Sequence, residues 1–112
     1  MFSEESIALA AQRIAAASSS PAKVILIGSY ARGDATEDSD VDLVVLQKEF
    51  KDRPNEYRRL IGEIHKELRR VDLILMREED FEWKSRVGGT LPYWTKKEGR
   101  VLHDFANLAL QP

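Results

Sequence analysis

The sequence predicts one α+β domain of the α/β-sandwich type over residues 1–112, in which helices pack on a mixed β-sheet. Short segments rich in Val, Ile and Leu alternate with segments whose apolar residues recur at helical spacing. The connection between the first two apolar segments is too short for a parallel crossover, whereas a helix separates the second from the third. With 112 residues and 43% hydrophobic side chains, the chain suits one core of sheet and helices, without room for a separate substrate-binding domain.

The first predicted helix begins after Ser3, a capping hydroxyl that is followed by the acidic residues Glu4 and Glu5. Its apolar positions have helical spacing: Ile7, Ala10, Ala11, Ile14 and Ala17. The sequence Ser-Ser-Ser-Pro at residues 18–21 ends this helix.

Three buried strands are predicted, at residues 23–27, 41–46 and 71–75, because each is a short run of apolar and β-branched side chains. Gly28 ends the first strand. The small polar residues that follow leave room for a single helical turn at residues 29–32.

A second long helix is expected between the second and third strands, where Asp52 precedes Arg53 and Pro54. Its apolar stripe consists of Tyr57, Leu60, Ile61, Ile64 and Leu68. Four arginines are expected to decorate it: Arg58, Arg59, Arg69 and Arg70. A helix of about 17 residues suffices for a parallel crossover, so the last two strands are expected to be parallel and the first two antiparallel.

Smaller elements follow: a short helix from Glu78, a flexible Gly88-Gly89, a helical turn at residues 93–97, and Gly99 before a last apolar pair at residues 101–102. This region is dense in aromatic side chains, namely Phe81, Trp83, Tyr93 and Trp94. They are expected to serve packing or a partner interface.

Composition argues against several classes of protein and site. The chain has no cysteine, which excludes disulfide scaffolds, thiolate zinc sites and cysteine nucleophiles. Acids near the N-terminus and the lack of a long apolar run predict a cytoplasmic protein without a signal peptide or membrane span. A net charge of −2 without a basic stripe makes nucleic acid an unexpected partner. His65 is expected at the surface, and neither it nor His103 belongs to a metal cluster.

Gly28 and Ser29 form a candidate phosphate site. A glycine at the end of a strand lets the backbone approach a ligand closely, and a following helical turn offers N–H groups together with the serine hydroxyl. Alone, however, such a pair is most often a turn glycine with a capping serine.

Asp40 and Asp42 are candidate magnesium ligands. Residues two apart in a strand share a face and are about 6.6 Å apart along it, so their carboxylates can converge on one point. Magnesium prefers carboxylate oxygens, and two ions can clamp the attacking and leaving oxygens of an in-line displacement. The alternative is a solvated acidic turn, to which Asp34, Glu37 and Asp38 are assigned.

A calcium-binding EF-hand loop is a weaker alternative, with Asp38, Asp40, Asp42 and Glu49 at the ligand positions. Leu43 stands where that loop needs glycine for its turn, and the residues that follow are apolar. The sequence therefore favours a strand at this position.

Asp72 completes the candidate set. If the last two strands are parallel and the first two antiparallel, then Ser29, Asp40, Asp42 and Asp72 all lie at one edge of the sheet.

These residues also resemble a known family. The sequence GSYARGDATEDSDVDLVV is similar to the signature of the DNA polymerase β nucleotidyltransferase superfamily, in which Gly-Ser is followed after ten residues by Asp-x-Asp. The nearest branch is the minimal nucleotidyltransferases, whose recurring stretches stand here at residues 28–33 and 39–43, with Val71-Asp72-Leu73 in the place of the third carboxylate. The resemblance covers residues 5–104. It implies the nucleotidyltransferase fold.

The resemblance also implies roles for these residues. Gly28 and Ser29 would bind the triphosphate of ATP, while Asp40 and Asp42 would bind Mg²⁺, with two ions expected. Asp72 would complete the metal site and act as, or orient, the base that deprotonates the acceptor hydroxyl. Arg32 would pair with phosphate or with acids of its loop. Relatives often end in Tyr-Glu after a glycine and an apolar pair, where this chain has His103-Asp104.

Three functions follow as hypotheses. The resemblance suggests an antitoxin that transfers AMP from ATP to a HEPN-domain ribonuclease toxin, and the small size of the chain favours a partner that presents the hydroxyl. A small-molecule nucleotidyltransferase, of the kind that modifies aminoglycosides, is the second. The third is a module that neutralises a toxin by binding alone. The sequence leaves both homo- and hetero-oligomers open.

Overall fold

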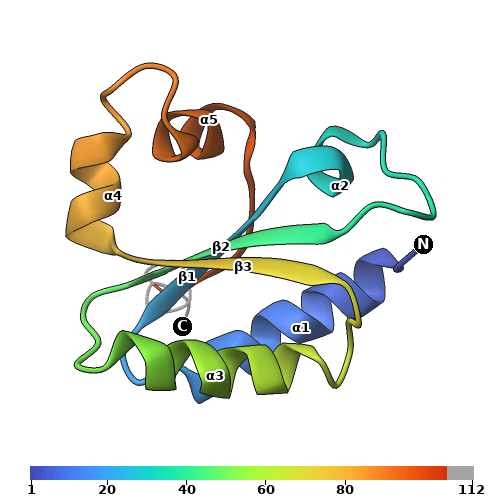
Figure 1. Ribbon diagram of the computed structural model, residues 1–112, viewed down its shortest axis with the longest axis horizontal. Helices are drawn as coiled ribbons and strands as arrows, with labels where there is room; N and C mark the ends of the chain where they lie inside the picture. The colour runs from blue at the N-terminus through green and yellow to red at the C-terminus, as the bar shows by residue number, and fades with distance from the viewer. Residues whose placement is uncertain (106–112) are drawn as a thin grey trace, which may run out of the picture.

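A four-stranded mixed β-sheet organises the computed structural model, which describes residues 1–105 (Figure 1). The strands are β1 (Ala22–Ile27), β2 (Val41–Gln47), β3 (Val71–Arg77) and β4 (Arg100–Asp104), in the spatial order β3-β2-β1-β4. The helices are α1 (Glu4–Ala17), α2 (Gly28–Arg32), α3 (Arg53–Ile64), α4 (Glu78–Lys84) and α5 (Leu91–Glu98). The predicted fold class is therefore confirmed. The prediction of a single domain also covers residues 106–112, which lie outside the described residues.

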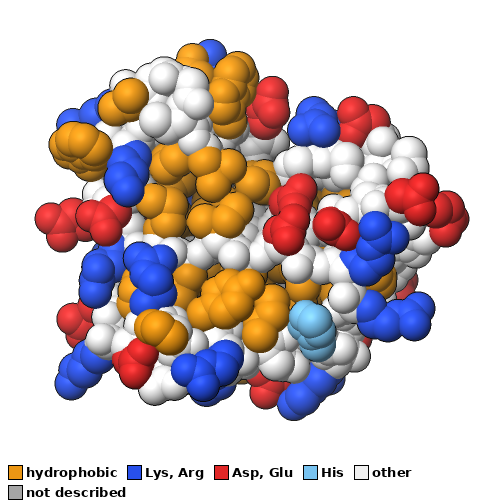
Figure 2. All heavy atoms as spheres, viewed as in Figure 1, with side chains coloured by type: hydrophobic (Ala, Val, Ile, Leu, Met, Phe, Trp, Pro, Cys, Tyr) orange, Lys and Arg blue, Asp and Glu red, His pale blue; other side chains and the backbone are white. Residues whose placement is uncertain are grey.

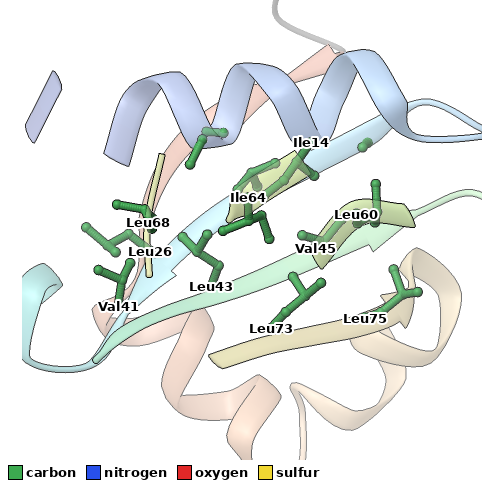
Figure 3. Close-up of a cluster of buried hydrophobic side chains, with 14 of the residues drawn as sticks. Ile14, Leu26, Val41, Leu43, Val45, Leu60, Ile64, Leu68, Leu73 and Leu75 are labelled. Carbon is green, nitrogen blue, oxygen red and sulfur yellow. The ribbon is translucent and has the colours of Figure 1, made fainter. Parts of the chain in front are cut away.

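Helices α1 and α3 cover one face of the sheet (Figure 1). They begin at the predicted caps, since the Ser3 side chain accepts a hydrogen bond from the Ser6 N–H at 3.1 Å and Asp52 accepts one from Asn55 at 3.3 Å. Side chains of both helices meet alternate residues of the strands, as Figure 3 shows. The labelled members of this core are Ile14, Leu26, Val41, Leu43, Val45, Leu60, Ile64, Leu68, Leu73 and Leu75.

The opposite face of the sheet carries a smaller core beneath α4 and α5. Its buried members are Ile25, Val44, Leu46 and Phe81, and Ile27, Ile74 and Met76 pack against them. In the C-terminal region the Phe81 side chain is buried, whereas Trp83 and Trp94 are 67% and 47% exposed. Of the four aromatics, only Phe81 is therefore a core residue.

Strand pairing agrees with the predicted topology. β1 and β2 are antiparallel, with Ile27 opposite Asp42, and β2 and β3 are parallel, with Asp42 opposite Asp72. The end of β1 and the starts of β2 and β3 therefore lie at the same edge of the sheet.

The second long helix is shorter than expected. α3 ends at Ile64 after 12 residues, and the exposed His65 is its C-cap. Leu68 is fully buried beyond the helix end, while Tyr57 is 38% exposed although its spacing suggested the core face. The prediction for two arginines was wrong as well: Arg69 and Arg70 belong to the connection that turns back into β3.

The fourth strand was not predicted, because an apolar pair at residues 101–102 is too short to indicate a strand by itself. β4 forms by pairing antiparallel with the free side of β1. Gly99 permits this approach, since a Cβ atom there would lie 2.5 Å from the Ile25 side chain and 2.4 Å from the Thr95 carbonyl oxygen. Within residues 1–105, no helix has the length and apolar character that crossing a membrane requires.

Candidate active site

One end of the sheet brings the predicted site residues together. α2 begins where β1 ends, and the paired residues Asp42 and Asp72 stand near the starts of β2 and β3. Figure 2 shows acidic side chains at this end of the sheet, beside an apolar surface that follows the sheet. Because paired residues of neighbouring strands point to the same face, Asp42 and Asp72 lie on the face that also bears Ile27.

Gly28 is required at the turn from β1 into α2. Its φ of +74° lies in the left-handed region that L side chains rarely adopt. A Cβ atom at this position would lie 2.3 Å from the Asp42 Oδ2 atom, which is far inside van der Waals contact. The glycine therefore lets the backbone of the turn approach the Asp42 carboxylate.

Asp42 is a half-buried carboxylate under electrostatic stress. Burial raises its pKa above the usual 3.8, and the neighbouring charge of Asp72, a hydrogen bond with Asp72 and the charge of Asp40 raise it further. The charge of Arg32 acts in the opposite direction and lowers the pKa. A site of this kind favours a proton or a cation beside the two carboxylates.

Asp40 belongs to the same group but is engaged elsewhere. Its Oδ1 atom accepts a hydrogen bond from the Arg70 Nε atom at 3.1 Å. Among the described residues, no three acidic or histidine side chains are arranged to hold one metal ion. The convergence expected from the sequence is thus incomplete: Asp42 and Asp72 are neighbours, and Asp40 is turned towards Arg70.

Ser29 and Arg32 lie on α2, the single helical turn that the sequence predicted. The Ser29 carbonyl oxygen accepts hydrogen bonds from the N–H groups of Gly33 and Asp34, at 2.9 and 3.0 Å, which closes the turn. Arg32 pairs with Asp34 at 3.4 Å on the exposed side. The pairing with an acid of its loop is therefore confirmed, while the pairing of Arg32 with phosphate stays a prediction.

The EF-hand alternative fails on geometry. Residues 41–47 form strand β2 in the middle of the sheet, so residues 38–49 cannot close into a calcium loop.

Comparison with known proteins agrees with this architecture. The family model described as "Nucleotidyltransferase domain" matches residues 9–97. The chain belongs to this nucleotidyltransferase family. Two proteins of Methanocaldococcus jannaschii, each described as a "Putative protein adenylyltransferase", match this nucleotidyltransferase domain over short segments, at 67% identity over 28 residues and 62% over 24. These segments cover 25% and 21% of this chain, and only 28% and 24% of the length of the relatives.

A solved structure supports the fold. A crystal structure described as that of a "putative nucleotidyltransferase" from Sulfolobus solfataricus superposes with a TM-score of 0.55. The match covers 89% of this chain and 78% of the other at 22% identity. It shows that the two proteins share the nucleotidyltransferase fold.

The donors of this nucleotidyltransferase domain suit a divalent cation. Carboxylate oxygens are the ligands that Mg²⁺ prefers, and a cation would offset both the burial of Asp42 and the charge of the neighbouring Asp72 that raise its pKa. Asp42 and Asp72 would be the first ligands, and Asp40 would join them once its carboxylate is free of Arg70.

Arg70 is the residue of this site that the sequence reasoning missed. It was assigned to the surface of a helix, yet three of its nitrogen atoms face the connection that carries Asp40. The signal that could have found it is the strand register, because Asp42 opposite Asp72 places Asp40 next to Arg70.

Proposed function

We propose that this domain is a magnesium-dependent adenylyltransferase, which moves AMP from ATP to a hydroxyl group on a partner protein. The observation that carries the proposal is the Asp42–Asp72 carboxylate pair beside the Gly28-Ser29 turn, on a chain of the nucleotidyltransferase family. The descriptions of the two short matches as adenylyltransferases of proteins support this choice of acceptor.

Each residue of the candidate site has a separate proposed role. The turn at Gly28 would let the triphosphate approach the backbone, with Ser29 donating its hydroxyl and Arg32 its positive charge to phosphate oxygens. Asp72 is the exposed member of the carboxylate pair and would be open to an incoming acceptor, so it would take or direct the hydroxyl proton. Mg²⁺ on the aspartates would neutralise charge on the attacking and leaving oxygens.

The transfer itself is a substitution at phosphorus. The acceptor oxygen forms a bond to the α-phosphorus of ATP as the bond to the bridging oxygen of pyrophosphate breaks. The proton of the acceptor hydroxyl leaves through Asp72, and pyrophosphate carries away the electron pair of the broken bond. Catalysis in such a reaction is mostly positioning and charge stabilisation.

The partner follows from the resemblance to the minimal nucleotidyltransferases. We propose a HEPN-domain toxin as the acceptor and neutralisation by AMP transfer, which would make this chain the antitoxin of a cytoplasmic toxin–antitoxin pair.

The test is intact-mass spectrometry of the proposed HEPN-domain partner, after incubation with the chain, ATP and Mg²⁺. The expected result is a mass gain of one AMP residue on the partner, which Asp42→Asn reduces by at least about 100-fold. A stable complex without any mass gain would reduce the proposal to binding alone. Modification of a free aminoglycoside without a partner would instead indicate a small-molecule nucleotidyltransferase.

A further inference from the structure

Arg70 is held at the candidate site by three polar contacts. Its Nε atom donates to Asp40 Oδ1 at 3.1 Å, and Nη2 donates to the carbonyl oxygen of Asp38 at 2.6 Å. Its Nη1 atom approaches the carbonyl oxygen of Glu37 at 3.5 Å. Arg70 directly precedes β3, and its guanidinium therefore links β3 to the connection that leads into β2.

The strand register fixes this arrangement. Asp42 pairs with Asp72 and Val41 with Val71, and the Val41 N–H donates to the Arg70 carbonyl oxygen at 3.0 Å. One step further along the same parallel pair, Asp40 and Arg70 are neighbours. Arg70 thus precedes β3 directly and is hydrogen-bonded through its backbone to β2.

The contact occupies the one candidate ligand that stands apart from the other two. The side chains of Asp40 and Arg70 are 44% and 50% exposed, and an exposed ion pair of this kind contributes little to stability. A divalent cation beside Asp42 and Asp72 would attract a third carboxylate more strongly, because it carries two charges. After releasing Asp40, the guanidinium would keep its two carbonyl partners, so it has no need to leave the site.

The geometry points to Arg70 as a positioning residue that competes with a divalent cation for Asp40. This inference rests on the proposed metal site and goes beyond it, since it names the group that withholds the third ligand. Removing the guanidinium is expected to strengthen cation binding.

The experiment measures Mn²⁺ affinity by electron paramagnetic resonance, without nucleotide or partner. Arg70→Ala is expected to bind Mn²⁺ about threefold to fivefold more tightly than the unmodified chain, as loss of an exposed ion pair allows. Arg70→Gln keeps a donor for the carbonyl oxygens and serves as the second variant if the alanine form does not fold. It is expected to show the same gain.

Two controls separate competition from a general effect of charge. Arg69→Ala removes the same charge one residue earlier, from a side chain without an ion pair in the described residues, and is expected to change the affinity by less than about twofold. In an Asp40→Asn background the effect of Arg70→Ala is expected to vanish, because the two residues act through one contact.

The outcomes are distinct. Weaker Mn²⁺ binding by both Arg70 variants, an equal gain from Arg69→Ala, or a gain that persists with Asp40→Asn would each overturn the role of Arg70. Mn²⁺ binding that is absent, or that survives Asp42→Asn, would instead overturn the metal site on which it rests.

Discussion

At the scale of single residues, the site depends on a glycine and a carboxylate that constrain each other. Gly28 has a positive φ that strains any other residue, and a Cβ atom there would force the Asp42 carboxylate to move. Asp42 in turn has a raised pKa because it is half-buried beside Asp72. The arrangement costs stability and concentrates negative charge, which is common at functional sites.

Gly28→Ala tests the close approach. The expected loss is about 2–4 kcal/mol in the free energy of unfolding, because the variant combines a strained φ with a contact inside van der Waals distance. Gly33→Ala is the matched control: its φ is +86°, but nothing lies within 4 Å of an added Cβ atom. It is expected to lose only about 1 kcal/mol in urea denaturation. Equal losses would contradict the role given to the Asp42 contact.

Asp42→Asn tests the electrostatic stress. Because the pKa of Asp42 is raised in the folded state, its ionisation opposes folding at neutral pH. The variant is therefore expected to be more stable than the unmodified chain at pH 7 in a chelating buffer. The difference should disappear as the pH falls through the folded pKa of Asp42 towards 3.8, its usual value. A variant less stable at neutral pH would contradict this assignment.

At the scale of elements, a buried carboxylate joins three segments far from the site. Glu56 of α3 is 4% exposed and accepts hydrogen bonds from the Gln47 side chain at 2.7 Å, the Ser19 N–H at 2.9 Å and Arg59. Burial alone would raise its pKa, but these hydrogen bonds outweigh burial and lower it below 4.5. They fasten α3 to the end of β2 and to the connection after α1.

Glu56→Gln is expected to lower the free energy of unfolding at pH 7 by about 1–3 kcal/mol. The amide group of the glutamine would face the N–H groups that donate to the Glu56 carboxylate, and it can accept fewer of their hydrogen bonds. With the pKa lowered in the folded state, the contribution of Glu56 is complete above pH 4.5 and is lost as the pH falls through the folded pKa. Urea denaturation between pH 3 and 7 checks this. Glu79→Gln, at an exposed position of α4, is the control and is expected to change stability by less than about 0.5 kcal/mol.

The sequence predicted those helices and strands whose limits depend on local residues. The caps at Ser3 and Asp52 and the apolar runs of β1, β2 and β3 were predicted, since propensity and burial agree there. The early end of α3 and the existence of β4 were not, because both depend on contacts with distant parts of the chain. The same cause hid Arg70, whose partners are about 30 residues away in the sequence.

At the scale of the whole molecule, the strand order leaves β3 at one edge of the sheet. An open edge offers unpaired backbone groups to another chain. Arg53 covers part of it, because its guanidinium donates to the Leu75 carbonyl oxygen and lies 4.9 Å from the centre of the Phe50 ring. The start of α3 thus covers part of this edge near the end of β3.

Arg53→Ala is expected to expose that carbonyl group and increase self-association. Sedimentation equilibrium over rising protein concentration checks the prediction, with a shift of at least about threefold in the association constant. Arg58→Ala is the control, since Arg58 lies beside the same edge strand but donates no hydrogen bond within the described residues. Equal behaviour of the two variants would show that Arg53 does not protect the edge.

The central claim is that the carboxylates at this end of the sheet transfer a nucleotide rather than a phosphate. It is tested most directly by incubating the chain and the proposed HEPN-domain partner with Mg²⁺ and ATP labelled at either the α- or the γ-phosphate. The predicted result is α-label on the partner, γ-label in released pyrophosphate, and neither with Asp42→Asn. Transfer of the γ-label to the partner, or α-labelling that survives Asp42→Asn, would contradict the claim.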